Sequence, residues 1–276
     1  MTSNPQTSIL NKVRKASRAT SDLVLGLAPV TQAGVLGSMG PGAAGKALNS
    51  IYRWDFLPAG LLGIAAGRDP HHTAIIDDGG SLTYEELHER STALARALRH
   101  GDIQQRDRIG VLARNHRGFI MALCAHGRLG TDLVLLNTGA SAEQTLAVIR
   151  EQKIDFLFID EEFTHMLPED FDECPVAVSW FENYGDTSCV REGWTSMQEM
   201  LKTAPPAKWP TAELPTRPRR GRVIILTSGT TGTPKGAKRP EPRSWMPASS
   251  IMSRIPLRQR RPAYLAAPLF HTWGFA

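Results

Sequence analysis

Alternating strand and helix patterns between residues 73 and 227 limit the fold of this 276-residue sequence more than any other feature. Strands are predicted at four apolar runs: Arg108–Ala113, Leu133–Leu136, Ile154–Ile159 and Val223–Leu226. Helices are predicted at Thr83–Arg99, His116–Arg128 and Ser141–Gln152, and the leucines of the first recur at helical spacing. A helix between two strands returns the chain to the same end of the sheet, so the strands run parallel. The sequence therefore predicts a layered α/β domain with a largely parallel sheet.

Local signals indicate where several elements begin and end. Thr83 with Glu86, and Ser141 with Gln144, have the spacing of helix capping boxes. Gly101 is predicted to end the first of these helices. Residues 73–83, with Asp-Gly-Gly near their centre, are predicted to form a small hairpin.

The two ends of this ordered region carry weaker patterns. Residues 1–50 are predicted to be a loosely structured leader, and residues 51–276 to be the folded part. Basic and apolar residues mix over 9–18, which suits peripheral contact with an anionic membrane, a helix packed on the domain or a frayed terminus. Between 160 and 215, frequent prolines predict short strands and one helix near 196–203.

The run from Val223 to Gly236, Val-Ile-Ile-Leu-Thr-Ser-Gly-Thr-Thr-Gly-Thr-Pro-Lys-Gly, joins a buried strand to a loop of glycines, hydroxyls and one lysine. Backbone N–H groups approach a phosphate closely where side chains are absent, as at glycine. Hydroxyl groups add hydrogen-bond donors, and Lys235 adds a positive charge. The residues predicted to bind phosphate are Thr227, Ser228, Gly229, Thr230, Thr231, Gly232, Thr233 and Lys235.

This loop differs from the Walker A loop, which requires Gly-x-x-x-x-Gly-Lys-Ser/Thr. Pro234 stands five positions after Gly229, and Gly236 follows the lysine. The alternative interpretation of any Gly/Thr loop is a flexible turn with a solvated lysine. The ordered run of ten residues from Thr227 favours the phosphate site.

A second motif, Ala-Pro-Leu-Phe-His-Thr-Trp-Gly, occupies residues 267–274. Together the two motifs resemble the acyl-adenylating (AMP-forming) superfamily of acyl-CoA synthetases, peptide-synthetase adenylation domains and luciferases. Residues 227–236 are similar to its signature phosphate loop, and 268–274 to its Pro-Leu-Phe-His-x-x-Gly segment. A lone histidine beside aromatic residues is more often a core residue than a functional one. The resemblance instead implies that His271 lines the substrate pocket.

Residues before the loop resemble the same superfamily less specifically. Asn115, the helix that ends at Gly130, and Leu135–Thr138 match its order of elements. These residues are interpreted as structural, with Asn137 in a strand-to-helix turn. The segment 238–256 departs from the family, because its prolines permit only a short helix where relatives have a longer one.

The resemblance implies a two-step reaction. A carboxylate attacks the α-phosphate of Mg-ATP to give an acyl-adenylate, and the thiol of coenzyme A then displaces AMP. Lys235 is the implied catalytic residue, because it stabilises charge on the phosphates. ATP, Mg²⁺ and coenzyme A are the implied cofactors and co-substrates. No residue of this chain is assigned as a metal ligand.

Members of the superfamily are longer than this chain, so we expect residues 51–276 to be a truncated N-terminal domain without the C-terminal domain. The expected function is a fatty acid–CoA ligase whose catalysis needs a downstream half, which is one expected partner. The alternative is a non-catalytic remnant of such a ligase that binds nucleotide or acyl group or has a regulatory role. A medium- or long-chain fatty acid is the predicted carboxylate, with aryl acids, bile-acid-like acids and amino acids left open.

The cysteine content and the charge distribution limit the class of protein and its partners. Cys124, Cys174 and Cys189 form no C-x-x-C pair, which disfavours a disulfide framework or zinc site and indicates a reducing, cytoplasmic setting. Residues 201–276 contain 14 Lys and Arg against two acidic residues, whereas residues 1–200 contain 18 against 25. The positive charge of residues 201–276 suits the binding of ATP and coenzyme A, which are anionic. No nucleic-acid-binding pattern accompanies it, and its arginine runs at 217–222 and 258–261 are interpreted as solvated loops.

Overall fold

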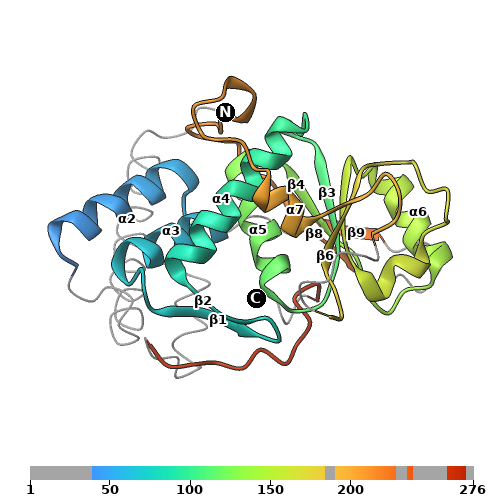
Figure 1. Ribbon diagram of the computed structural model, residues 1–276, viewed down its shortest axis with the longest axis horizontal. Helices are drawn as coiled ribbons and strands as arrows, with labels where there is room; N and C mark the ends of the chain where they lie inside the picture. Colours follow the sequence, from blue (N-terminus) through green and yellow to red (C-terminus); the bar gives the residue numbers. More distant parts are fainter. Residues whose placement is uncertain (1–38, 184–189, 228–234, 239–259, 272–276) are drawn as a thin grey trace, which may run out of the picture. The chain divides into compact units, whose positions relative to one another are not determined.

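The computed structural model describes residues 39–183, 190–227, 235–238 and 260–271 (Figure 1). The chain divides into two compact units, one formed by 1–40 with 242–264 and the other by 41–241 with 265–276. The second unit contains the sheets and their helices.

The helices of this unit include two short 3₁₀ turns, η1 and η2. Their bounds are α2 (Pro41–Trp54), α3 (Pro58–Arg68), α4 (Tyr84–His100), α5 (Arg117–Leu129), α6 (Ala142–Gln152), η1 (Glu161–Met166), α7 (Met197–Lys202) and η2 (Pro210–Ala212). The strands are β1 (Thr73–Asp77), β2 (Gly80–Thr83), β3 (Arg108–Leu112), β4 (Asp132–Leu135), β5 (Phe156–Asp160), β6 (Val176–Trp180), β7 (Thr195–Ser196), β8 (Val223–Thr227) and β9 (Lys235–Lys238).

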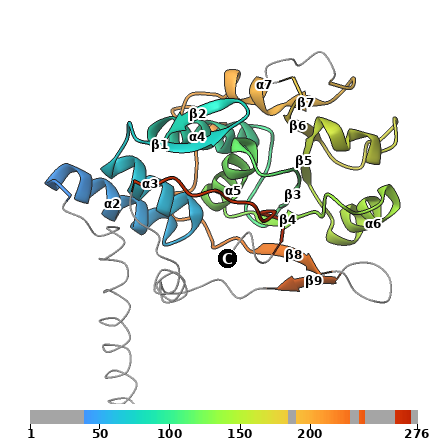
Figure 2. The same ribbon diagram turned by 90° about the horizontal axis from the view of Figure 1, so that it is seen from below.

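The main sheet has the strand order β7-β6-β5-β3-β4-β8-β9. Its first six strands pair in parallel, and β9 pairs antiparallel with β8 at the edge. Figure 2 shows β8 and β9 side by side beyond β4. A separate hairpin pairs β1 with β2. The predicted layered α/β fold, with its largely parallel sheet and small hairpin, is confirmed.

Two apolar cores cover the two faces of the sheet, because successive side chains of a strand point to opposite faces. On one face, Val111 and Leu135 pack with α4, α5 and α7. On the other face, Leu112 and Val134 pack with α6 and η1. In Figure 1, α4 and α5 lie to one side of the sheet strands and α6 to the other. The helices that follow β3 and β4 therefore lie on opposite faces.

The predicted helix ends follow from local hydrogen bonds. The Glu86 N–H donates to Thr83 Oγ1 at 3.2 Å and the Thr83 N–H to Glu86 Oε2 at 2.7 Å, which completes the capping box of α4. Ser141 and Gln144 form the second box, at the start of α6. Helix α5 ends with a left-handed C-cap at Gly130, whose φ is +78°, whereas Gly101 ends α4 with a φ of −82°.

Helix α2 begins at Pro41, inside the range 1–50 that the sequence predicted to be loosely structured. Neither α2 nor α3 was predicted, because both sequences contain glycines, which have a low helix propensity. Small residues are required where these helices meet: a Cβ on Gly63 would lie 2.5 Å from Ser50 Oγ, and one on Gly60 would lie 2.0 Å from Asp55 O. The division into a leader and a domain at residue 50 stays a prediction.

Part of the arginine run at 217–222 does not form a solvated loop. Asp132, at the start of β4, is 1% exposed and accepts hydrogen bonds from the Arg222 N–H at 3.0 Å and Nη2 at 2.6 Å. Arg219 also donates to it. Burial raises the pKa of Asp132, but the hydrogen bonds from Arg222 and Arg219 outweigh it and hold the pKa below its usual value. This ion pair fixes the entry to β8 beside β4.

Two glycine substitutions test how tightly the layers pack. A Cβ on Gly110, in the central strand β3, would lie 2.7 Å from Ile154 Cδ1 and 2.9 Å from Leu157 Cδ1. We expect Gly110→Ala to lower the free energy of unfolding by about 1–3 kcal/mol, the usual cost of overpacking. Gly45→Ala in exposed α2 meets nothing within 4 Å and should raise it by about 0.5–1 kcal/mol. Urea unfolding of both variants checks this, and equal effects would contradict it.

Candidate active site

The predicted phosphate loop joins β8 to β9. Thr227 is the last residue of β8 and pairs with Lys235, the first residue of β9. Because β8 lies parallel to β4, the loop leaves the sheet at the edge where the parallel strands end. Ser228, Gly229, Thr230, Thr231, Gly232 and Thr233 lie outside the described residues. The structure therefore places the ends of the loop, at Thr227 and Lys235. It also adds β9, which the sequence did not predict.

The described part of the second motif is a turn tied to the end of β3. The Leu269 N–H donates to Asn115 Oδ1 at 2.8 Å, and Asn115 Nδ2 donates to Ala267 O at 2.8 Å and to Leu265 O at 3.3 Å. The Leu269 side chain is 8% exposed and packs in the same core as α4 and α5. The predicted pocket residue His271 is exposed, and its N–H donates to Pro268 O at 3.0 Å.

These two motifs meet the sheet near its topological switch point. The outgoing helices of the adjacent strands β3 and β4 lie on opposite faces, which makes the carboxyl ends of these two strands a topological switch point. Asn115 follows β3, and Asn137 follows β4. Asn137 Oδ1 accepts a hydrogen bond from the Gly139 N–H at 2.9 Å, which forms the predicted strand-to-helix turn. In open α/β sheets, ligands bind outside the carboxyl ends of the strands at such a switch point.

A buried polar cluster lies at the same edge of the sheet, where β3, β5 and β6 end. Asp160 Oδ2 accepts from the Arg114 N–H at 2.8 Å, and Oδ1 accepts from Ser179 Oγ at 2.6 Å. His116 Nε2 lies 2.9 Å from Asp160 Oδ1, while its Nδ1 accepts from the Gly118 N–H at 3.0 Å. Nε2 therefore carries the proton and donates to Asp160. The His116 ring also stacks on Trp180, with ring centroids 4.7 Å apart.

This cluster has the residue types of a Ser-His-Asp triad but a different arrangement. Both Ser179 and His116 donate to the same carboxylate, and the second nitrogen of His116 caps α5. His116 has no free nitrogen to accept a proton from the serine, and all three residues are buried. The cluster therefore holds the ends of β3, β5 and β6 together. No local sequence pattern marks this cluster, because its members are widely separated in the chain.

A second buried ion pair joins the small hairpin to α5. The Arg117 N–H donates to Asp77 Oδ2 at 2.8 Å and its Nε to Asp77 Oδ1 at 2.9 Å, and Nη2 donates to Gly80 O at 2.9 Å. Burial raises the pKa of Asp77, but the Arg117 contacts outweigh it, and the pKa lies below its usual value. The hairpin is thereby held against the start of α5, two residues after Asn115.

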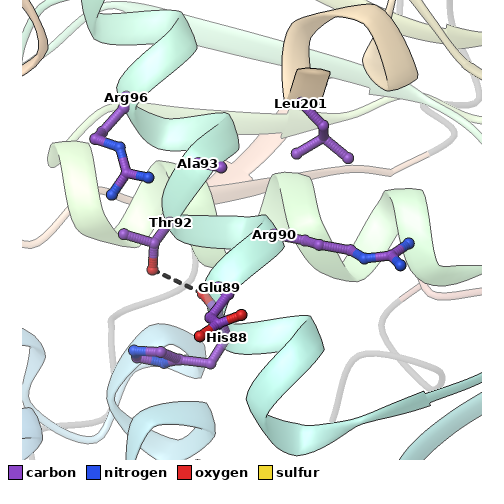
Figure 3. A pocket seen from close by; sticks show the side chains of 7 residues that line it. All are labelled: His88, Glu89, Arg90, Thr92, Ala93, Arg96 and Leu201. Carbon is purple, nitrogen blue, oxygen red and sulfur yellow. Dashed lines mark hydrogen bonds between the residues drawn. The ribbon is translucent and has the colours of Figure 1, made fainter. Parts of the chain in front are cut away.

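A hollow of the described structure lies elsewhere. It has a volume of about 520 Å³ and is lined by His88, Glu89, Arg90, Thr92, Ala93, Arg96 and Leu201 (Figure 3). All but Leu201 belong to α4, and none is a predicted site residue. This hollow is remote in the chain from both motifs and contributes nothing to the candidate site.

A buried arginine lies beside His88. Arg128 is fully buried, and it donates from Nε to Thr92 Oγ1 at 3.0 Å and stacks over the Trp54 ring at 4.8 Å. Burial lowers the pKa of Arg128 to about 10. Burial, followed by the positive charges of Arg128 and Arg53, lowers the pKa of His88 to about 4. His88 is therefore neutral in the folded protein at neutral pH and can accept from Arg128.

Among the described residues, no three His, Cys, Asp or Glu side chains are grouped so that they could hold a metal ion. The described helices are also too short or too polar for any of them to cross a bilayer.

Known proteins are similar to this chain in sequence and in fold. The family of AMP-binding enzymes matches residues 63–276. A 2-succinylbenzoate–CoA ligase of Bacillus thuringiensis subsp. konkukian (strain 97-27) is 25% identical over 207 residues, which cover 75% of this chain and 38% of the relative. ScoC, a fatty acid–[acyl-carrier-protein] ligase of Streptomyces coeruleorubidus, is 28% identical over 178 residues, which cover 62% of this chain and 30% of the relative.

A solved structure, the O-succinylbenzoate coenzyme A synthetase of Bacillus subtilis in complex with ATP and a magnesium ion, superposes with a TM-score of 0.58. It is 22% identical, and the match covers 78% of this chain and 52% of that one. At this identity the likeness concerns the fold.

An open, largely parallel sheet with helices on both faces defines a domain of the doubly wound α/β class. The match over residues 63–276 then identifies the family: the chain belongs to the AMP-binding enzymes. It spans less than half the length of the two curated relatives described above.

Acid should destabilise the fold through its buried histidines. The unfolded chain protonates His88 near pH 6.5, whereas the folded protein keeps it neutral down to about pH 4, and burial lowers the pKa of His126 to about 4 as well. Unfolding therefore takes up protons between these pH values, so the free energy of unfolding should fall as pH falls through this window. Urea unfolding between pH 7 and 4 measures the slope. His88→Gln should reduce the slope and His71→Gln, at an exposed position, should not; equal slopes in all three proteins would contradict the assignment.

Proposed function

We propose that this chain is the N-terminal part of an AMP-forming acid–thiol ligase. One observation carries the proposal: β8 brings the ends of the Thr227–Lys235 loop to the carboxyl edge of the parallel sheet, and Asn115 ties the 265–271 turn to the same edge. Both motifs of the resemblance thus meet the sheet near the switch point, where a nucleotide and a carboxylate would have to lie together.

The residues present fit this chemistry in distinct ways. The loop from Thr227 to Lys235 supplies backbone N–H groups, hydroxyls and one lysine, which suit the β- and γ-phosphates of ATP. Lys235 is the proposed catalytic residue, because its charge would stabilise the developing charge on the phosphates. His271, at the end of the tied turn, is the proposed pocket residue for the carboxylate.

The co-substrates of the proposed reaction are ATP and coenzyme A, with Mg²⁺ bound to the nucleotide. The relative of known structure was solved with ATP and magnesium, which supports ATP and Mg²⁺ here. Mg²⁺ would be bound through the phosphates of ATP, as this ion usually is at nucleotide sites. The proposed acid is a medium- or long-chain fatty acid, which one relative's name supports, whereas the other relative's name supports an aryl acid.

The test of the proposal is acid-dependent exchange of labelled pyrophosphate into ATP, with fatty acids and 2-succinylbenzoate compared as the acid. It is run on this chain alone and after addition of a polypeptide that supplies the downstream half of a ligase. Exchange in either condition supports the ligase, and the preferred acid identifies the substrate class. Absence of exchange in both conditions would overturn the ligase and leave a non-catalytic nucleotide- or acyl-binding module.

Removal of the loop lysine should weaken the use of ATP. A hydrogen bond to a charged group contributes about 1.5–3 kcal/mol, so Lys235→Ala should raise the KM for ATP in the exchange assay about 10- to 150-fold. Lys238→Ala is the matched control, because Lys238 lies in the same strand but pairs with Ile224, away from the loop. An unchanged KM for ATP in Lys235→Ala would remove the phosphate-loop assignment.

Substitution of the pocket histidine should affect the acid rather than the nucleotide. We expect His271→Ala to raise the KM for the carboxylate by at least about threefold, the loss of one hydrogen bond, with the KM for ATP unchanged. His165→Ala, in the exposed 3₁₀ turn η1, is the control. Parallel increases in both KM values would instead indicate a general disturbance of the site.

A further inference from the structure

Asn115 makes a three-point contact with the backbone of the 265–271 turn. Its Oδ1 accepts from the Leu269 N–H at 2.8 Å, and its Nδ2 donates to Ala267 O at 2.8 Å and to Leu265 O at 3.3 Å. An amide side chain offers an acceptor and two donors, and here both functions are used on one segment. The two positions lie about 150 residues apart in the sequence, so the contact is made by the tertiary structure alone.

The position of Asn115 is itself fixed from both sides. The preceding residue donates its backbone N–H to Asp160 at 2.8 Å, and the following residue donates to the same carboxylate through His116 Nε2 at 2.9 Å. Ser179 completes the set at 2.6 Å. The Arg114 side chain is held by Glu162, with Nε and Oε1 2.5 Å apart. Because Asp160 is 1% exposed, the hydrogen bonds to its carboxylate are shielded from water and resist opening.

We propose that Asn115 is a positioning residue for the acyl side of the site, and that Asp160 is its anchor. Asp160 holds residues 114 and 116, the intervening Asn115 holds the turn at 265–269, and this turn sets the position of His271. The acyl-side role rests on the proposed function, whereas the connection from Asp160 through Asn115 to the turn rests on the contacts alone. This connection accounts for a half-buried asparagine whose amide nitrogen and oxygen both bind backbone groups beside a proposed pocket.

The apolar anchor of the same turn makes the proposal specific. The Leu269 side chain is buried in the core, whereas the flanking Pro268 and His271 are exposed. Leu269 therefore fixes the depth of the turn, and Asn115 fixes the direction of its backbone. Loss of Asn115 should leave the turn attached but free to vary in orientation, which would shift His271 without unfolding the domain.

Amide hydrogen exchange on the 276-residue chain tests the mechanical connection. Asn115→Ala removes the acceptor of the Leu269 N–H, so exchange of that amide should accelerate about three- to tenfold, the range for one net hydrogen bond. Asn49→Ala, the same change at an exposed position of α2, should leave it unaltered. Unchanged exchange of Leu269 in Asn115→Ala would overturn the proposal.

A second pair of variants tests the anchor. Asp160→Asn should accelerate the same amide by a smaller factor. Its control is Asp155→Asn, because Asp155 accepts from the Arg108 N–H at 2.7 Å and joins the same two strands at their opposite ends. If Asp160→Asn fails to fold by near-ultraviolet circular dichroism, Ser179→Ala removes only one of the hydrogen bonds to Asp160 and takes its place. Equal exchange in the anchor variant and its control would remove Asp160 from the proposal.

Ligand binding separates positioning from a merely structural role. We expect Asn115→Ala to weaken binding of a fatty-acyl sulfamoyladenosine, a stable mimic of the acyl-adenylate, about three- to tenfold, with AMP binding unchanged. Equal loss for both ligands would overturn the acyl-side role. If the unaltered chain binds neither ligand even after addition of the downstream half of a ligase, the acyl-side role falls with the proposed function, whereas the exchange of the Leu269 amide still decides whether Asn115 holds the turn.

Discussion

The parallel pairing of β8 with β4 is the constraint on which the site depends. Strand β8 follows β4 by about ninety residues, and its register matches Leu133 with Val223 and Leu135 with Ile225. The buried carboxylate of Asp132 fixes the start of this pairing by binding the backbone and guanidinium of Arg222. Breaking such a pair leaves an uncompensated buried charge, so the register is strongly favoured. A correctly registered β8 delivers the Thr227–Lys235 loop to the edge of the sheet.

Three carboxylates perform the same task at different places in the domain. Asp132 ties β8 to β4, Asp160 ties the ends of β3, β5 and β6, and Asp77 ties the hairpin to α5. Each accepts from a backbone N–H as well as from a side chain, and each joins segments distant in sequence. Apolar packing alone is non-directional, whereas a carboxylate with several fixed donors specifies one arrangement. The cores hold the layers together, and these carboxylates set their relative positions near the site.

The basic segment at 201–276 has two physical roles. Arg219 and Arg222 neutralise a buried aspartate and belong to the framework. Lys235 begins β9 at the end of the proposed phosphate loop. In contrast, the buried Arg128 is matched by an indole and a neutral histidine rather than by a carboxylate, among the contacts described. The positive charge of this segment is therefore partly structural, and its excess cannot be taken as a measure of affinity for anions.

The sequence by itself determined the class of fold and the identity of the two motifs. Capping boxes at Thr83 and Ser141, apolar periodicity and the β-branched run before Thr227 are local signals, and each depends on residues within a few positions of one another. The sequence did not predict α2, α3 or β9, because small-residue helix packing and edge pairing are decided by a partner elsewhere in the chain. It identified Asn115 only as structural and did not single out Asp160. Their contacts with Leu269, and with His116 and Ser179, exist only because a parallel sheet brings the ends of β3, β5 and β6 to one edge.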